Sequence, residues 1–417
     1  MKIFFSVGEP SGDLHGANLI RQLRQQAPDV QCVGFGGPRM AAAGCQLLAD
    51  LTELAVMWFL RAVLNLHRFW CFYRSATRYF RDHRPDAVVL IDYPGFNWWI
   101  ARAAKRYEIP VFYYGVPQMW AWAPWRVRKM RRLVDHVLCK LPFEAQWFQQ
   151  RGCQATYVGH PYFDQLSGQT LDQAFLSEMR RDGEPLITIL PGSRTQEVLA
   201  NLPWLLKTAA LIQRRLGNAR FAVASFNERQ AETACRMVAD SMLAAEVFVG
   251  RTGELIQASR CCLACSGSVS LELLFYTKPS LILYWVQRFP LRVATRLFIK
   301  VRFITLVNLL ADANPFLSPG QHYDASAASA DAVPLPEYLT CDDPSRVMAD
   351  RIVGWLKDDA VYQRRVKQLA DLKRRHADTG ASRIAAAYML GVLHQPASIP
   401  GPGPKRHADS CSGKRSA

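Results

Sequence analysis

The 417-residue sequence lacks any uninterrupted apolar run of about 18 residues, the length that a membrane-spanning helix requires. A long uncharged run, Ile109 to Trp125, is broken by three prolines. The start of the chain also lacks the basic segment, the apolar segment and the small-residue cleavage site of a secretory signal. These absences predict a cytoplasmic protein that has neither a spanning helix nor a leader.

Sequence patterns for common cofactors and crosslinks are missing too. The first strand-to-helix turn does not read G-x-G-x-x-G, and the second predicted strand ends in "VGFGGPRM" without an acid to hold a ribose, which disfavours a dinucleotide. The eleven cysteines are scattered and odd in number, which is typical of reduced residues in a protein core. Cys262 and Cys265 form a C-x-x-C, but no second pair or histidine cluster completes a metal site. We therefore expect no metal and no cofactor.

Acidic residues are few for the number of basic ones: 35 Asp and Glu stand against 51 Lys and Arg, which gives a net charge of +16. Such an excess predicts an anionic partner, which could be nucleic acid, an acidic membrane surface or a phosphorylated substrate. Zinc-finger spacing, an RNP-like pattern and a compact recognition helix are all absent from the sequence, so nucleic acid is disfavoured.

Short apolar runs alternate with helical patterns through both halves of the chain, which is typical of an α/β protein with parallel sheets covered by helices. In the first half, strands are predicted at 2–7, 30–35, 87–92, 111–115, 134–139 and 156–159. In the second half, they are predicted at 186–190, 220–225, 247–250, 261–265 and 280–283. The chain is thus predicted to consist of two similar Rossmann-like halves.

The predicted organisation is a first domain over 1–165 and a second over 186–355, joined by a polar segment over 164–185 that has no strand pattern. Helices over 356–394 follow and could return to the first domain, and 395–417 is predicted to be a disordered tail. A further stretch, 311–331, has the composition of a surface loop. The cleft between the domains, at the carboxyl ends of both sheets, is the expected ligand site.

The first candidate site residues lie in "GEPSGDLHGANLI", where the first strand turns into a helix. Gly8 and Gly12 allow a tight turn and close approach of a ligand, and Ser11 or Asp13 could cap the helix that follows. Exposed N–H groups at such a helix start favour an anion. A well-capped turn without a ligand explains the same residues about as well.

Two further turns combine small residues with charge at the ends of predicted strands. In "LPGSRTQEV", the turn offers backbone N–H groups, the Ser193 hydroxyl and the Arg194 guanidinium to a phosphate, and Glu197 lies in the first turn of the next helix. In "CSGSVSLELL", a turn of Ser266, Gly267 and Ser268 precedes Glu272 in the next helix. Together the turns could hold a pyrophosphate and a ribose, although Glu272 alone is better explained as a first-turn acid that favours the helix dipole.

Asp92 in "PDAVVLIDYPGFN" is the candidate general base. It ends a strand of apolar residues and is followed by a Pro-Gly turn, so its carboxylate should stand at the edge of the cleft. Asp86 opens the same strand and should lie at the opposite end. A turn-forming role for Asp92 is the alternative interpretation.

Two amphipathic segments combine bulky apolar groups with basic side chains. The first, 54–74, carries Arg61, Asn65 and Arg68 on one stripe. The second begins near Pro290 and carries basic residues at intervals of four: Arg288, Arg292, Arg296 and Lys300. Such stripes favour an anionic membrane surface or an acylated, phosphorylated ligand, and a packed helix or a subunit interface explains them as well.

Ten motifs occur in the order seen in one enzyme family. They are "GEPSGDLHGA", "GGPRM", "ELAVM", "RPDAVVLIDYPGFN", "VPQMWAW", "LPFE", "GHP", "LPGSRTQEV", "SGSVSLE" and "VNLLAD". In this respect the chain resembles the lipid-A-disaccharide synthases from about Lys2 to Leu310 and through the helices that follow.

The resemblance implies a GT-B glycosyltransferase with two Rossmann-like domains facing a central cleft. Members of the family join UDP-2,3-diacylglucosamine to 2,3-diacylglucosamine 1-phosphate with inversion, without an obligatory active-site metal, and release UDP and a β-1,6-linked disaccharide phosphate. The resemblance further implies a location on the cytoplasmic face of the inner membrane, held peripherally at its anionic surface, and it allows a homodimer.

The resemblance also implies roles for particular residues. Asp92 matches the family's proposed general base. The donor-binding set is Ser193, Arg194, Glu197, Ser266, Gly267, Ser268, Glu272 and Asn308, and the acceptor-side loop contains Gly8, Ser11, Gly12 and Asp13. Two other functions stay open on the residues alone: another UDP-sugar enzyme of this architecture, such as an epimerase, and a membrane-surface binding protein without catalytic activity.

Overall fold

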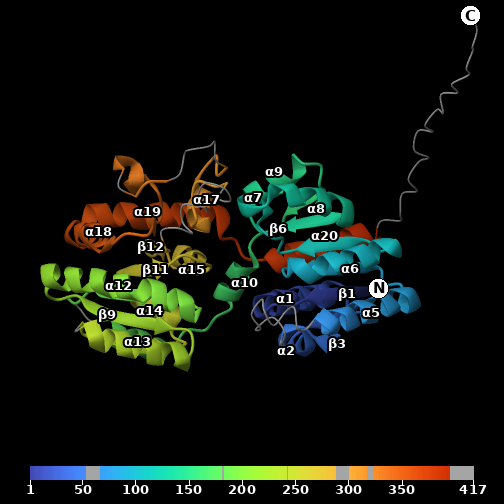
Figure 1. The fold of residues 1–417 in the computed structure, drawn as a ribbon, viewed down its shortest axis with the longest axis horizontal. Helices are drawn as coiled ribbons and strands as arrows, with labels where there is room; N and C mark the ends of the chain where they lie inside the picture. Colours follow the sequence, from blue (N-terminus) through green and yellow to red (C-terminus); the bar gives the residue numbers. More distant parts are fainter. Residues whose placement is uncertain are drawn as a thin grey trace, which may run out of the picture.

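The computed structural model describes residues 1–52, 66–180, 183–241, 243–287, 300–316, 323–325 and 327–394. Two parallel β-sheets, one in each half of the chain, are covered by helices on both faces (Figure 1). The predicted α/β class with two parallel sheets is confirmed. The stripe residues Arg61, Asn65, Arg288, Arg292 and Arg296, and the predicted tail over 395–417, lie outside the described residues.

The N-terminal sheet has seven parallel strands in the order β3-β2-β1-β4-β5-β6-β7. Their bounds are β1 Lys2–Val7, β2 Gln31–Gly36, β3 Cys45–Asp50, β4 Ala87–Ile91, β5 Val111–Tyr114, β6 His136–Cys139 and β7 Ala155–Tyr157. The central strand β4 is apolar and buried at every position, as expected of a parallel strand covered on both faces.

The C-terminal sheet has six parallel strands in the order β10-β9-β8-β11-β12-β13. Their bounds are β8 Leu186–Leu190, β9 Arg220–Ser225, β10 Ala245–Val249, β11 Cys261–Cys265, β12 Ser280–Trp285 and β13 Glu337–Thr340. Cys262 and Cys265 are both buried in β11, and every cysteine among the described residues is free.

The helices of the N-terminal half are α1 Pro10–Gln26, α2 Pro38–Ala42, α5 Leu66–His83, α6 Pro94–Arg106, α7 Met119–Trp122, η1 Pro124–Arg126, α8 Val127–Leu133, α9 Pro142–Gln149 and α10 Pro161–Ser167. Those that follow are α11 Gln173–Met179, α12 Thr195–Leu216, α13 Glu228–Ser241, α14 Thr252–Ala258, α15 Val269–Phe275, α17 Leu306–Ala311, η2 Ala328–Ala332, α18 Ser345–Lys357, α19 Asp359–His376 and α20 Ala381–His394. Among the described helices, none is both long and apolar enough to cross a bilayer.

All predicted strands are present, with ends shifted by no more than two residues, and the structure adds β3 and β13. Both additional strands lie at sheet edges, where one side of the strand has no neighbour. The sequence of β3, CQLLAD, is only partly buried, and β13 begins with the acid Glu337. Neither strand therefore has the continuous apolar run on which the prediction relied.

In the part of the chain that the structure describes, two crossings between the halves lie side by side. The first crossing runs through α10, and the second joins α19, which packs on the C-terminal half, to α20, which packs on α1 in the N-terminal half (Figure 1). Asp164 of α10 links them, because its carboxylate accepts hydrogen bonds from the backbone N–H groups of Gly380, Ala381 and Ser382 at the start of α20.

The stretch over 311–331 was predicted to be a surface loop. The structure corrects this prediction for Phe316, which packs against the other half of the chain. The Phe316 ring lies 6.2 Å from the Trp120 ring and 5.9 Å from the Phe143 ring, and both of these belong to the N-terminal half. Nearby, the Lys300 backbone N–H donates to the Ala121 carbonyl, 3.1 Å away. The segment therefore contributes to the contact between the halves instead of facing solvent throughout.

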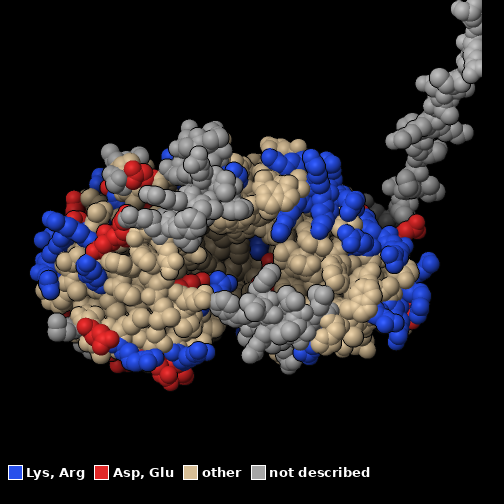
Figure 2. All heavy atoms as spheres, viewed as in Figure 1, with Lys and Arg blue, Asp and Glu red and all other residues tan. Residues whose placement is uncertain are grey.

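Each sheet has one point at which the strand order reverses, between β1 and β4 in the first sheet and between β8 and β11 in the second. In open parallel sheets, ligands bind outside the carboxyl ends of the strands at such switch points. Figure 2 shows a hollow between the two halves. The residues that follow these four strands therefore form the candidate site.

Candidate functional site

Asp92 directly follows β4 and has a left-handed backbone. Its φ is 45°, and Tyr93 after it has φ 43°, a conformation that costs energy for residues other than glycine. Two buried side chains hold this turn in place, because the Asn97 amide and the Tyr113 hydroxyl each donate to the Asp92 carbonyl oxygen at 2.7 Å. The backbone therefore fixes where the carboxylate emerges from the sheet.

The Asp92 carboxylate is only 21% exposed and stands between two glycines. A Cβ at Gly12 would lie 3.8 Å from its Oδ2, and a Cβ at Gly115 would lie 3.4 Å from its Oδ1. The Lys140 ammonium, just after β6, is 3.6 Å from Oδ1. The carboxylate thus sits at the switch point of the first sheet, as a residue acting on a ligand in the cleft would need to.

The opening stretch packs tightly around this turn. A Cβ at Gly8 would come within 2.4 Å of the Tyr93 ring, and a Cβ at Gly12 within 2.9 Å of Val7, so both positions require glycine for packing alone. Ser11 is exposed at the start of α1. The sequence singled out this loop, and the structure brings it beside Asp92.

The predicted cap of the first helix is wrong. The helix α1 begins after Glu9, and no side chain caps its start. Asp13 is instead buried, and its carboxylate accepts from the backbone N–H groups of Gly37, Arg39 and Met40 at 2.9–3.0 Å. It therefore holds the start of α2, and its oxygens are already engaged within the N-terminal half.

The turn after β8 is organised by Glu197. Its Oε2 accepts from the backbone N–H groups of Ser193 and Arg194, and its Oε1 accepts from the Arg194 guanidinium at 3.0 Å. Gly192, at φ 121°, is necessary here because a Cβ would lie 2.6 Å from that of Glu197. The two N–H groups that the sequence offered to a phosphate are thus occupied, while the Arg194 side chain is 82% exposed.

The turn after β11 lies next to the turn after β8. Asn201 of α12 connects them, since its amide donates to the Glu197 carbonyl at 2.8 Å and to the Cys265 sulfur at 3.3 Å. Gly267 and Ser268 are exposed and precede α15. The two predicted donor turns therefore share one end of the second sheet.

Glu272 lies deeper, within α15 and at the junction of the two halves. It is buried, and its Oε2 accepts a 3.2 Å hydrogen bond from the hydroxyl of Tyr162 on α10. Burial raises the pKa of Glu272 to about 7, an effect that the Tyr162 hydrogen bond opposes and the Glu254 charge reinforces. The structure thus connects this predicted donor residue directly to the interdomain segment.

Asn308 is buried and bonded within its own half. Its amide donates to the Leu335 carbonyl and to the Glu337 carboxylate, and its side-chain oxygen accepts from the Leu335 N–H. These contacts hold α17 against β13. The side chain predicted to bind the donor therefore has its amide and carbonyl groups already paired, which fits a supporting position better than a direct contact.

Three residues near Asp92 were missing from the predicted site: Glu9, His15 and Lys140. His15 is buried on α1, its Nδ1 has no hydrogen-bond partner, and burial together with the Lys140 charge lowers its pKa to about 4. Lys140 follows β6, and it therefore lies at the same carboxyl end of the sheet as Asp92. The strand-end rule that selected Asp92 could have selected Lys140 from the sequence.

Electrostatic interactions connect the two halves across the cleft. Burial and the Asp92 carboxylate raise the pKa of Glu9, while Arg194 of the other half and Lys140 oppose the rise. Arg194 thus lies within electrostatic reach of the turn that follows β1. Among the described residues no cluster of three or more His, Cys, Asp or Glu side chains could hold a metal ion.

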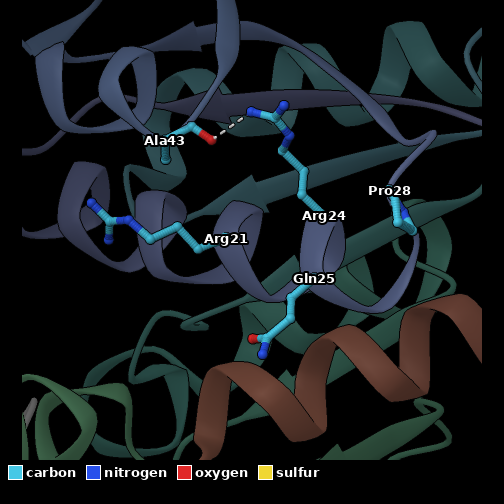
Figure 3. Close-up of a pocket in the computed structure, with 5 residues that line it drawn as sticks. All are labelled: Arg21, Arg24, Gln25, Pro28 and Ala43. Atoms are coloured by element: carbon cyan, nitrogen blue, oxygen red, sulfur yellow. Dashed lines mark hydrogen bonds between the residues drawn. The ribbon is translucent and has the colours of Figure 1, made fainter.

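The structure shows two other surface features. A shallow depression of about 400 Å³ is lined by Arg21, Arg24, Gln25, Pro28 and Ala43, at the far end of α1 from Gly12, and the Arg24 guanidinium donates to the Ala43 carbonyl there (Figure 3). The second feature, termed the α8 surface, consists of Trp122, Trp125, Arg128, Lys129, Arg131 and Arg132, all of them exposed. Lys and Arg gather at this part of the N-terminal half in Figure 2.

Comparison with known proteins identifies the family. The model for the family described as lipid-A-disaccharide synthetase matches residues 3–337. Among curated relatives, the lipid-A-disaccharide synthase of Trichlorobacter lovleyi is 30% identical over 396 residues, covering 94% of this chain and 98% of its own. That of Geobacter sulfurreducens is 31% identical over 393 residues, covering 94% and 97%.

Solved structures show the same architecture at low sequence identity. The UDP complex of S. aureus MnaA has a TM-score of 0.61 at 12% identity, covering 94% of this chain and 96% of that chain. The calicheamicin glycosyltransferase CalG4 has a TM-score of 0.55 at 13% identity, covering 95% and 99%. The predicted GT-B fold is confirmed by these likenesses, and by its sequence the chain belongs to the lipid-A-disaccharide synthase family.

Proposed function

We propose that this chain is an inverting glycosyltransferase of lipid A biosynthesis. It joins UDP-2,3-diacylglucosamine to 2,3-diacylglucosamine 1-phosphate and releases UDP. The observation that carries the proposal, beside family membership, is that the candidate groups follow the four switch-point strands, with Asp92 after β4 and the two donor turns after β8 and β11. One substrate is then held by each half.

In the proposed reaction, the acceptor 6-hydroxyl oxygen bonds to the anomeric carbon of the donor as the bond from that carbon to the UDP oxygen breaks. Asp92 takes the hydroxyl proton as general base. Its fixed backbone and its place between Gly12 and Gly115 support this role, since neither glycine places a side chain of its own against the carboxylate. The acceptor-side loop from Gly8 to Asp13 forms the adjoining wall.

On the donor side, Arg194 and the turn from Ser266 to Ser268 hold UDP. The exposed Arg194 guanidinium supplies positive charge where the departing diphosphate gains negative charge, which stabilises the transition state. Glu197 positions Arg194 by its hydrogen bonds to the turn. Glu272, beside this turn, is the proposed partner of the ribose hydroxyls.

Peripheral attachment to the cytoplasmic face of an anionic membrane completes the proposal. The α8 surface supports it, because two exposed tryptophans stand beside four basic side chains: Trp122 is 47% and Trp125 is 62% exposed. Aromatic and basic groups together favour the interface of an anionic bilayer. Both proposed substrates carry acyl chains, so attachment brings the cleft to them.

The decisive test is UDP release from chemically defined UDP-2,3-diacylglucosamine on addition of the acceptor. Asp92→Asn is expected to lower turnover at least about a hundredfold, the scale of a general-base contribution, while UDP binding survives. Asp86→Asn is the matched control, because Asp86 lies at the other end of β4 and accepts from the Lys2 N–H. Turnover by the wild-type protein without acyl chains on the donor, or normal turnover by Asp92→Asn, would contradict the proposal.

A further inference from the structure

A buried cation stands beside the proposed general base. Lys140 follows β6, and its Nζ is 3.6 Å from the Asp92 Oδ1. The side chain of Lys140 is 17% exposed and that of Asp92 is 21% exposed, so both charges are largely removed from water. Solvent screens the attraction between two such charges only weakly, so the pair interacts more strongly than it would on the surface.

The pair forms across an intervening strand, and a glycine makes this possible. The strand β5 lies between β4 and β6, and Gly115 follows β5 with φ 70°. A Cβ at Gly115 would lie 3.4 Å from the Asp92 Oδ1 and 3.6 Å from the Lys140 Nζ, which places this position between the two charges. Three neighbouring strand ends thus provide the carboxylate, the gap and the ammonium.

The other titratable groups around the pair leave Lys140 as the direct counter-ion of Asp92. Burial and the Lys140 charge lower the pKa of His15 and His160, so both are neutral near pH 7. Glu144 accepts from the Trp120 indole N–H and the Lys140 backbone N–H. Other groups that interact electrostatically with the pair are Glu9, Tyr113, Tyr114 and Cys139.

Lys140 itself stays charged in this environment. Burial lowers its pKa, but the carboxylates of Asp92 and Glu144 outweigh that effect and leave the pKa above its usual value. An ammonium this close restrains the direction of the Asp92 carboxylate.

We propose that Lys140 is a positioning residue for the reaction: it holds the Asp92 carboxylate toward Gly12 and the acceptor hydroxyl, and its charge is part of the environment in which that carboxylate acts as the base. This inference rests on the proposed role of Asp92 as general base. Lys140 acts through Asp92 and takes no part in the bond changes.

The pH profile of kcat/KM tests the inference. The acid limb of the profile reports ionisation of the base, and removing a neighbouring cation raises the pKa of a carboxylate. In Lys140→Met the acid limb is therefore expected to move to higher pH by about one unit. Lys140→Arg should restore its position, since a cation is kept.

The matched control is Lys105→Met. Lys105 forms an ion pair with Asp135 in the same half, just before β5 and β6 begin, and thus at the opposite edge of the sheet. Its removal also deletes a partly buried pair but should leave the acid limb unmoved. If Lys140→Met is not folded by circular dichroism, Lys140→Gln carries the same expectation.

An unmoved acid limb in a folded, active Lys140 variant would overturn the inference. Failure of the proposed function would look different, because the wild-type protein would then not release UDP from the defined substrates, or Asp92→Asn would turn over normally. A merely structural role for Lys140 would lower stability and leave the limb in place.

Discussion

At the scale of single residues, the buried carboxylate of Asp13 organises the loop that adjoins Asp92. It accepts three backbone N–H bonds from residues 24 to 27 positions later in the chain. Its Oδ2 also lies 2.8 Å from the position that a Cβ at Gly37 would occupy, so the contact is close-packed. The first strand-to-helix turn and the start of α2 are thereby held together.

Asp13→Ala should lower the free energy of unfolding by roughly 2–4 kcal/mol, because it leaves several buried N–H groups without a partner. Chemical denaturation followed by circular dichroism measures the change. Asp29→Ala, at an exposed position on the same half, should stay within about 0.5 kcal/mol of the wild-type protein. A loss no larger in Asp13→Ala than in Asp29→Ala would refute the assigned role.

The candidate residues differ in how far the sequence could predict them. The end of an apolar strand is visible in the sequence, so the locations of Asp92, Arg194 and the turn from Ser266 to Ser268 were predictable from it. The partners of Asp13 and Asn308 were not, because both side chains bond to segments brought near only by folding. Lys140 also directly follows a mostly apolar strand, so the pattern that predicted Asp92 applies to it as well.

At the scale of elements, strand prediction succeeded where burial on both faces imposes a continuous apolar run, as in β4 and β8. It failed at two of the four edge strands, β3 and β13, and β13 begins with Glu337. That carboxylate is buried and accepts from the N–H groups of Ile304 and Thr305 and from the Asn308 amide. An acid satisfied by tertiary contacts cannot be told from a loop residue by its sequence alone.

The attachment of α20 to the N-terminal half depends on one cap. Asp164 accepts from three N–H groups at the start of α20, whose Ala385 and Met389 are buried in the core beneath α1. Asp164→Ala should destabilise this attachment by about 1–2 kcal/mol, the usual worth of a helix cap. Amide hydrogen exchange should accelerate in α20 and at the start of α1.

Asp172→Ala is the control for that experiment. Asp172 caps α11 in the same linker through the N–H groups of Ala174 and Phe175, and it pairs with Arg251. Its loss should accelerate exchange in α11 and leave α20 unchanged. Equal exchange in α20 for the wild-type protein and Asp164→Ala would show that the core contacts hold this helix without the cap.

At the scale of the whole molecule, the net charge of +16 is spread unevenly, and part of it is concentrated on one surface. The α8 surface concentrates four cations beside two exposed aromatic side chains, on the same half as the proposed base (Figure 2). The sequence had pointed to 54–74 and to the segment after Pro290 for this purpose. The α8 surface is thus a further part of the chain suited to an anionic bilayer.

Co-sedimentation with vesicles of phosphatidylglycerol and phosphatidylethanolamine measures this property. Replacing Trp122 and Trp125 together by alanine should weaken binding about tenfold, and raising the salt concentration should weaken binding of the wild-type protein. Phe226→Ala is the matched control, since Phe226 is 69% exposed on the other half. Unchanged binding of the double variant would exclude the α8 surface as the point of attachment.

The two neighbouring crossings between the halves also have a mechanical consequence. The two crossing segments are in close contact at Gly159 before α10, where a Cβ would lie 3.2 Å from the Ala381 Cβ. Asp164 also connects these two segments, through its hydrogen bond from the Ala381 N–H. A single connecting segment would allow one half to rotate about it, whereas two neighbouring segments resist such a rotation. We therefore expect any opening of the cleft to be a bend about these two segments and not a twist, which would keep the carboxyl ends of the two sheets opposite each other.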